Sequence, residues 1–318
     1  MSFISVLLAL LIEQARPMGP GNRVHALIRV WVRWSSRNFD TGKAGHAWLV
    51  WGVATVMPSL LALGVYWLLD WLVGWPLALV WSVAILYVTL GFRQFSSYFT
   101  QIRDALADGD EVLARELLAR WQQIDARDLP RSAIVRHAIE HSVIAAHRHV
   151  FGVLAWYSVL AAFGLGPAGA VLYRLSEFVG RYWQRVGDTQ QHAVSEALQQ
   201  VARTAWYWVD WLPARITAIS FAVVGSFEEA IDGWRHHERT LVGDNDALIL
   251  AATAGAVNIR LQTTGAANPA QASLDTIAPA LGQTPELAHL AVIVGLVWRS
   301  VVMWIVLLAL LTLARLLG

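Results

Sequence analysis

The chain has 318 residues, of which 56% are hydrophobic and only 15% are charged, and its mean hydropathy is +0.47. Soluble domains usually carry about 25% charged residues, so this chain lacks the charge to coat two soluble domains of ordinary size. The apolar content excludes a disordered chain, the absence of cysteine excludes disulfide scaffolds and thiolate sites, and the net charge of +1 argues against nucleic acid as a partner.

These properties predict an all-α, polytopic helical membrane protein with cytoplasmic helical segments. A helix needs about 20 apolar residues to cross the hydrocarbon core of a bilayer. Asp70 separates the first two apolar runs, which predicts a tight helical hairpin, and Gly166-Pro167 ends the third run because proline disfavours helix in the preceding residue. The expected spans lie near residues 47–69, 71–92, 150–167 and 296–316.

Two further apolar segments are too short to cross the bilayer in the same way. Residues 2–12 are followed by Glu13 and by no small-residue cleavage site, so we expect a retained N-terminal helix, partly inserted or packed on the others. Whether this helix spans the membrane is left open. Residues 216–227 follow Pro213 and are expected to form a re-entrant or buried segment.

The segments between the spans differ in charge and composition. Residues 13–46 are rich in arginine, whereas the hairpin tip at 70–75 has no basic residue, so we expect the tip outside and the flanking loops in the cytoplasm. The cytoplasmic loop 93–149 is expected to be helical, and 168–261 to be helical or re-entrant. Residues 262–285 are rich in Ala, Gly, Thr, Pro and Gln, which predicts a flexible loop.

The histidines form a weak candidate for a metal site. His137 and His141 are spaced i, i+4, which places two ligands on one helical face. The sequence between them does not follow the zinc-protease motif, because the glutamate adjoins the second histidine. We favour histidines at the membrane interface and assign no metal ligand.

Charged residues beside apolar segments are more informative, because charge is costly in lipid and usually faces protein or water. Arg174 and Glu177 are three residues apart and are expected to pair on one helical face. Asp210 and Arg215 flank Pro213 within an aromatic and aliphatic stretch. These four residues either line a polar cavity or form structural pairs.

Three segments together resemble the CobD/CbiB family of membrane proteins of cobalamin biosynthesis. They are GPAGAVLYR at 166–174, DWLPARITA at 210–218 and AATAGAVNIRL at 251–261. Arg127-Asp128, followed by Arg136 and Glu140, also resembles a cytoplasmic stretch of that family. The first two segments are equally similar to AmpE, an inner-membrane protein linked to β-lactamase induction, whereas the third is closer to CobD/CbiB. The resemblance covers residues 1–261, and we treat 1–318 as a single membrane domain of this type.

The resemblance implies a multi-pass protein of the bacterial inner membrane that forms an amide bond. The reaction would join adenosylcobyric acid to aminopropanol or its phosphate and give cobinamide, with ATP and magnesium as cofactors if the synthase interpretation holds. The implied catalytic residues are carboxylates: Asp128, Glu140, Glu177 and Asp210. The implied substrate-binding residues carry a guanidinium or a phenol: Arg127, Arg136, Tyr173, Arg174 and Arg215.

The chain departs from the family pattern mainly at acidic and amide positions. The family's Asn-Thr-Leu-Asp element falls on 177–180, which reads Glu-Phe-Val-Gly, and its paired aspartates fall on Trp206-Tyr207. A metal–nucleotide site without its carboxylates loses the charge that holds the cation. Whether the chain is an enzyme is therefore left open.

Two alternatives follow from the same residues. The chain is either a synthase of the cobinamide type or a non-catalytic, AmpE-like sensor or accessory protein, in which these charges contact an envelope-derived ligand or a partner. A small-molecule carrier is the third hypothesis, although the sequence has no internal repeat. The expected partners are the lipid bilayer and a corrinoid or an envelope-derived ligand, and the oligomeric state is left open.

Overall fold

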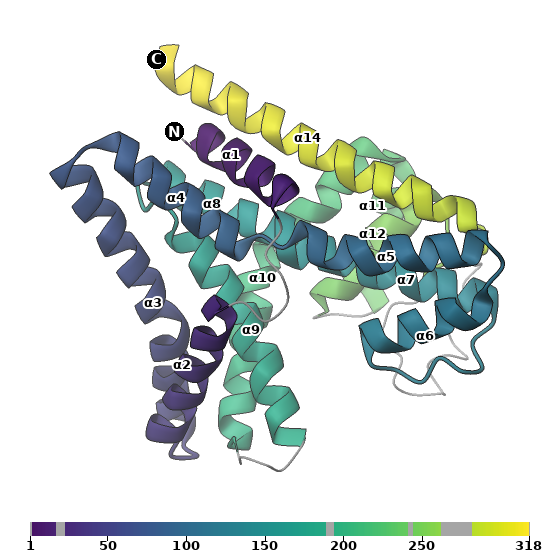
Figure 1. The fold of residues 1–318 in the computed structure, drawn as a ribbon, viewed down its shortest axis with the longest axis horizontal. Coiled ribbons are helices and arrows are strands. Elements are labelled where there is room, and N and C mark those ends of the chain that lie inside the picture. The colour runs from purple at the N-terminus through teal and green to yellow at the C-terminus, as the bar shows by residue number, and fades with distance from the viewer. Residues whose placement is uncertain (1, 17–22, 189–193, 241–243, 262–281, 318) are drawn as a thin grey trace. The chain divides into compact units, whose positions relative to one another are not determined.

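The computed structural model describes residues 2–16, 23–188, 194–240, 244–261 and 282–317, and within these ranges the fold is all-α, as the sequence predicts (Figure 1). The described residues also contain an isolated β-bridge between Ile259 and Gln283. The helices are α1 (Ser2–Ala15), α2 (Arg23–Phe39), α3 (Ala44–Leu72), α4 (Trp75–Thr89), α5 (Phe92–Ala107), α6 (Glu111–Gln122), α7 (Arg131–Ala146), the π-helix η1 (His147–Phe151), α8 (Gly152–Ala162), α9 (Ala168–Asp188), α10 (Glu196–Val224), α11 (Phe227–Thr240), α12 (Asn245–Val257) and α14 (Leu287–Leu317).

Among the residues that the structure describes, three helical segments are long and apolar enough to cross a membrane. They are Ala44–Leu72, Arg131–Ala162 (which joins α7, η1 and α8) and Leu287–Ala314. They overlap the spans expected near 47–69, 150–167 and 296–316. These segments make the chain a membrane protein whose environment is a lipid bilayer.

The expected span at 71–92 is shorter in the structure. Helix α4 has 15 residues, because Gly74 has φ +93°, a conformation that favours glycine, and Trp75-Pro76 begins a new helix. Helix α3 ends at Leu72, so a turn at Val73-Gly74 connects α3 to α4 in the hairpin. With 15 residues, helix α4 is about 22 Å long at 1.5 Å per residue.

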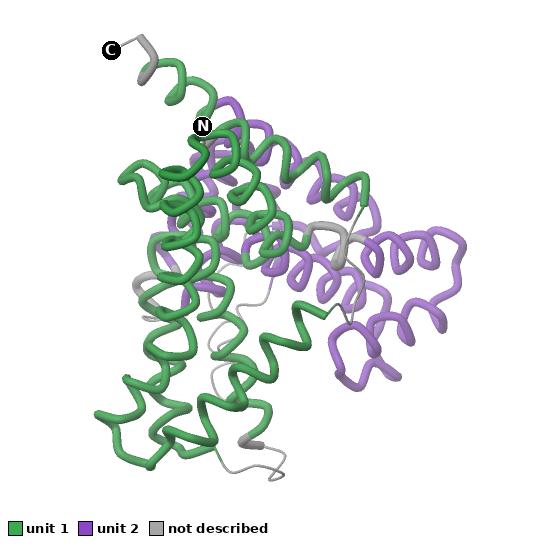
Figure 2. Tube along the Cα trace, turned by 60° about the vertical axis from the view of Figure 1, so that its left-hand side comes forward, with its two compact units in different colours: residues 1–92, 148–213, 307–318 green, residues 93–147, 214–306 purple. Residues whose placement is uncertain are grey.

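The chain divides into two compact units, drawn in green and purple in Figure 2. Unit 1 contains Met1–Phe92, Arg148–Pro213 and Leu307–Gly318, and unit 2 contains Arg93–His147 and Ala214–Val306. Helices α10 and α14 contribute residues to both units.

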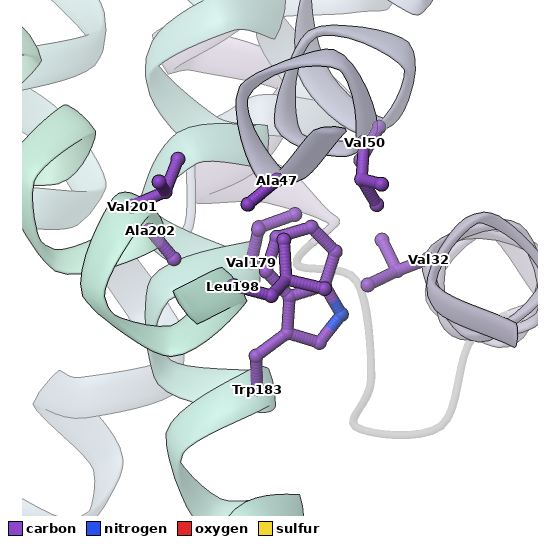
Figure 3. Packing of buried hydrophobic residues seen from close by; sticks show 9 residues of the cluster. Val32, Ala47, Val50, Val179, Trp183, Leu198, Val201 and Ala202 are labelled. Atoms are coloured by element: carbon purple, nitrogen blue, oxygen red, sulfur yellow. The ribbon is translucent and has the colours of Figure 1, made fainter. Parts of the chain in front are cut away.

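In unit 1, helix α3 packs against α2, α4 and α9, while α9 also packs against α8, and α1 packs against α4 and α8. The apolar residues 2–12 therefore belong to a helix packed on others, one of the two arrangements expected for this segment. Part of the core lies where four helices meet, and Figure 3 shows Val32, Val50, Val179 and Trp183 there, all fully buried or nearly so. Burying one such side chain contributes about 1.5–3 kcal/mol.

In unit 2, helix α12 packs tightly against α11 and also against α7, and α6 packs on α7. The α11–α12 contact needs glycine at position 255, because a Cβ there would lie 2.1 Å from the Glu229 carbonyl oxygen. The residues expected to form a re-entrant segment begin as part of α10, which continues through Pro213 to Val224. Of the expected flexible loop 262–285, residues 262–281 lie outside the described part of the chain.

Candidate functional site

The antiparallel contact between α8 and α9 lies beside buried polar residues of unit 1, among them Tyr173. A Cβ at Gly169 would lie 2.2 Å from the Trp156 carbonyl oxygen, and a Cβ at Gly152 would lie 2.0 Å from Cζ of Tyr173. Gly152 and Trp156 are one turn apart on α8, and Gly169 and Tyr173 are one turn apart on α9. The two glycines therefore allow close approach at successive turns of the same helix pair.

A hydrogen bond between Tyr173 and Asp210 lies beside this contact. The Tyr173 hydroxyl donates to Oδ1 of Asp210 at 2.8 Å, and both residues are fully buried. The Trp206 ring, one turn before Asp210 on α10, has its centroid 5.3 Å from that of Tyr173. Burial, together with the negative charge of Asp210, raises the pKa of the Tyr173 hydroxyl well above its usual value, so the hydroxyl stays a donor.

An ion-pair triad occupies the next turns of α9. Nη1 of Arg174 and Nη2 of Arg181 each donate to Oε2 of Glu177 at 3.0 Å, and Nε of Arg181 contacts Oε1. The Glu177 side chain is 1% exposed, whereas those of Arg174 and Arg181 are 15% and 41% exposed. Burial alone would raise the pKa of Glu177, but the neighbouring arginines, Arg181 above all, lower it below its ordinary value.

A third arginine acts on the same carboxylate. Arg148 lies in the π-helix η1, and its Cζ is 5.9 Å from the centroid of the Trp206 ring. Its charge also contributes to lowering the pKa of Glu177. Single-turn π-helices are frequent at functional sites.

On α2, burial and then the charge of Arg174 lower the pKa of His25, which favours a neutral imidazole.

In unit 2, helix α7 carries a second buried carboxylate. Glu140 is 8% exposed, and its side chain lies 3.7 Å from Nε of Arg136 and 3.8 Å from Nδ1 of His137. Arg215 is partly buried in the C-terminal part of α10. Near it in sequence, the Thr217 hydroxyl lies 2.9 Å from Nδ1 of His147, and both of these residues are fully buried.

The remaining two candidates, Arg127 and Asp128, lie on an exposed turn before α7. The Arg127 side chain donates two hydrogen bonds to Asp125, of 2.7 Å and 3.0 Å, and its backbone N–H donates a third of 3.2 Å, so its partner is an exposed residue. Hydrogen bonds from Arg127 lower the pKa of the Asp125 carboxyl to about 2. This geometry is typical of a surface ion pair.

The structure therefore brings together the four candidates from unit 1, namely Tyr173, Arg174, Glu177 and Asp210, and separately pairs Arg136 with Glu140 within unit 2. Several neighbours of the first group were not predicted, among them Arg148, which also acts on Glu177. Arg181 could have been found from its i+4 spacing to Glu177. Gly152 and Trp206 carry no sequence pattern that connects them with Tyr173, because the connection is a packing contact between helices.

Metal coordination is a poor fit to these residues. Within the described ranges, no group of three or more His, Asp or Glu side chains is placed to hold a metal ion. Both oxygens of Glu177 face arginines. Magnesium prefers several oxygen ligands, so the described residues do not form a magnesium site.

Comparisons with known proteins give one consistent result. The model of the CobD/CbiB protein family matches residues 3–183. The cobalamin biosynthesis protein CobD of Chromobacterium violaceum is 31% identical over 196 residues, which cover 60% of each chain and thus less than two thirds of that relative. The protein of the same name from Stutzerimonas stutzeri is 29% identical over 312 residues, 96% of each chain.

No solved structure matches the chain. The family model and both relatives agree with the resemblance seen in the sequence, and they give no support to the AmpE alternative.

Proposed function

Because the chain belongs to the CobD/CbiB family, we propose that it acts in cobalamin biosynthesis as a multi-pass protein of the bacterial inner membrane. The observation that carries this proposal is the alignment with the Stutzerimonas stutzeri CobD protein over 96% of both chains. The three candidate spans are consistent with a multi-pass location.

We infer that the reaction is the one that the resemblance implies. The amino group of aminopropanol, or of its phosphate, forms an amide bond with a carboxyl group of adenosylcobyric acid. The carboxylate must first be activated, a role that the family resemblance assigns to ATP. As the C–N bond forms, the C–O bond to one carboxylate oxygen would break, and that oxygen would leave with the phosphate group that ATP supplies. In such a reaction the protein has to hold an anionic substrate, exclude water and accept a proton from the attacking amine.

The unit 1 cluster contains groups suited to these tasks. The guanidiniums of Arg174 and Arg181 match the geometry of a carboxylate or phosphate group. Glu177 contacts both of them, so we assign it to orienting these arginines and not to proton transfer. Asp210, which accepts the Tyr173 hydrogen bond, is the proposed proton acceptor.

The unit 2 candidates have a supporting place in the proposal. Arg136 and Glu140 form a partly buried pair on α7, and Arg215 is partly buried on α10, so we propose them as a second set of substrate contacts. Arg127 and Asp128 are exposed, and we propose that they contact substrate at the protein surface.

Complementation tests this proposal. A strain lacking the gene is expected to fail to grow where cobinamide synthesis is required, and the wild-type gene is expected to restore growth. Asp210→Asn is expected not to restore it, whereas Glu116→Gln, in an exposed pair with Arg120, is expected to restore it. Growth of the deletion strain without the gene would overturn the proposal.

A further inference from the structure

We propose that Gly152 is a positioning residue, whose missing side chain sets the Tyr173 hydroxyl on Asp210. This inference rests on the proposed function only for the role of Asp210, because the geometry itself is independent of any substrate. An ideal Cβ at position 152 would lie 2.0 Å from Cζ of Tyr173 and 2.1 Å from its hydroxyl oxygen. Real Cβ atoms do not approach other atoms so closely, so a side chain at 152 and this tyrosine position exclude each other.

The clash falls on the functional end of the tyrosine. The atoms that Cβ would meet are the hydroxyl oxygen, the ring carbon that carries it and the adjacent Cε1, and the hydroxyl oxygen is the atom that donates to Asp210. Because these atoms are the far end of a side chain, they are the part that yields. Any displacement lengthens the 2.8 Å hydrogen bond to Oδ1 of Asp210.

The surroundings leave Tyr173 little room to keep this bond by moving elsewhere. The residue is fully buried, and the Trp206 ring lies against it at 5.3 Å between centroids, tilted by 53°. Both Trp206 and Asp210 are on α10, one turn apart. The tyrosine hydroxyl is therefore held between α8, where Gly152 lies, and α10, where its acceptor lies.

A second contact fixes the helix that carries the acceptor. Nε1 of Trp156, one turn after Gly152, donates to the carbonyl oxygen of Val209 at 2.8 Å. Val209 directly precedes Asp210, so α8 determines the position of the acceptor as well as that of the donor. Gly169 permits the close approach of α9 to the same turn of α8. Helices α8, α9 and α10 thus pack together around the Tyr173–Asp210 hydrogen bond.

Gly152 does not touch substrate in this account and acts only through Tyr173. A general packing role is the competing explanation, since overpacking destabilises any tight helix pair. The two explanations differ in what they predict for the tyrosine hydroxyl, which is buried beside a carboxylate in the wild-type protein and has a raised pKa.

Spectrophotometric titration of tyrosinate at 295 nm separates them. The chain has seven tyrosines, and in the wild type Tyr173 is expected not to ionise near the ordinary pKa of about 10. In Gly152→Ala, one more tyrosine than in the wild type is expected to ionise at about pH 10. In the double variant Gly152→Ala with Tyr173→Phe, this additional ionisation is expected to be absent. Gly64→Ala is the matched control, because a Cβ at this α3 position meets nothing within 4 Å.

The same variants are then assayed for cobinamide formation. We expect Gly152→Ala to lower kcat by about tenfold or more with a smaller change in KM, since misplacement by about 1 Å costs up to about 100-fold in rate. A wild-type titration curve for Gly152→Ala would overturn the proposal. Because the titration needs no substrate, its failure is distinct from a failure to detect the proposed reaction.

A double-mutant cycle keeps the test valid if Gly152→Ala is poorly folded. Tyr173→Leu removes the atoms that the new Cβ would meet, so adding Gly152→Ala to it is expected to lower the melting temperature far less than in the wild-type background. An equal loss in both backgrounds would show that Gly152 serves helix packing alone, and the proposal would be wrong.

Discussion

Arg181 faces both carboxylate oxygens of Glu177, with Nη2 donating to Oε2 at 3.0 Å and Nε in contact with Oε1. The residues are one helical turn apart on α9, so the helix itself sets this two-point contact. Arg174 reaches Oε2 from the turn before. One buried carboxylate therefore holds two guanidiniums, and its removal leaves two cations without their partner.

We predict that Glu177→Gln destabilises the protein by about 3 kcal/mol, the usual cost of removing one member of a buried ion pair. The measurement is thermal unfolding of the purified protein in detergent. Glu116→Gln, in the exposed pair with Arg120, is the matched control and is expected to change stability by less than about 0.5 kcal/mol. Equal effects of the two substitutions would contradict a structural role for the triad.

Gly255→Ala is expected to destabilise unit 2. A Cβ at this position would lie 2.1 Å from the Glu229 carbonyl oxygen and 2.7 Å from Cα of Ala230, so the α11 backbone itself must move. Overpacking of this kind costs about 1–3 kcal/mol. Gly295→Ala on α14, where a Cβ meets nothing within 4 Å, is expected to be neutral or slightly stabilising. A neutral Gly255→Ala would disprove the close α11–α12 contact.

Trp183→Ala is expected to cost about 3–5 kcal/mol, because it removes a fully buried aromatic side chain from the junction of α2, α3, α9 and α10. Trp208→Ala, at a position that is 64% exposed, is expected to cost much less. Comparison of their unfolding midpoints checks the core shown in Figure 3. Similar midpoints would indicate that these helices do not meet as described.

The Arg127–Asp125 pair predicts a pH dependence with a definite sign. The pKa of Asp125 is about 2 in the folded state, below its ordinary value of 3.8. Its contribution to stability is therefore present above about pH 4 and is lost as the pH falls toward 2. Asp125→Asn is expected to remove this part of the acid dependence in unfolding measured between pH 2 and 6. An unchanged profile would show that the pair does not persist in solution.

The sequence predicted those features that depend on local spacing. Helix type and the long apolar helices near 47–69 and 296–316 follow from hydrophobic run length, and the Arg174–Glu177 pair follows from the i, i+3 spacing. The helical segment Arg131–Ala162 begins inside the loop expected at 93–149, because its first half carries charged residues and is not part of an apolar run. The length of α4 was overestimated, because the length of the apolar run does not show that the chain turns at Gly74 and that a new helix begins at Trp75-Pro76. The Tyr173–Asp210 bond joins residues 37 positions apart on two helices, so no local pattern could predict it. Gly152 was missed for the same reason.

Product formation by the purified protein, reconstituted in lipid nanodiscs, tests the central claim most directly. With adenosylcobyric acid, aminopropanol or its phosphate, ATP and magnesium ions, the wild type is expected to form the cobinamide-type amide. Asp210→Asn is expected to lose at least about 100-fold in rate, as for removal of a general base. Absence of product from the wild type, or a wild-type rate in Asp210→Asn, would contradict the account.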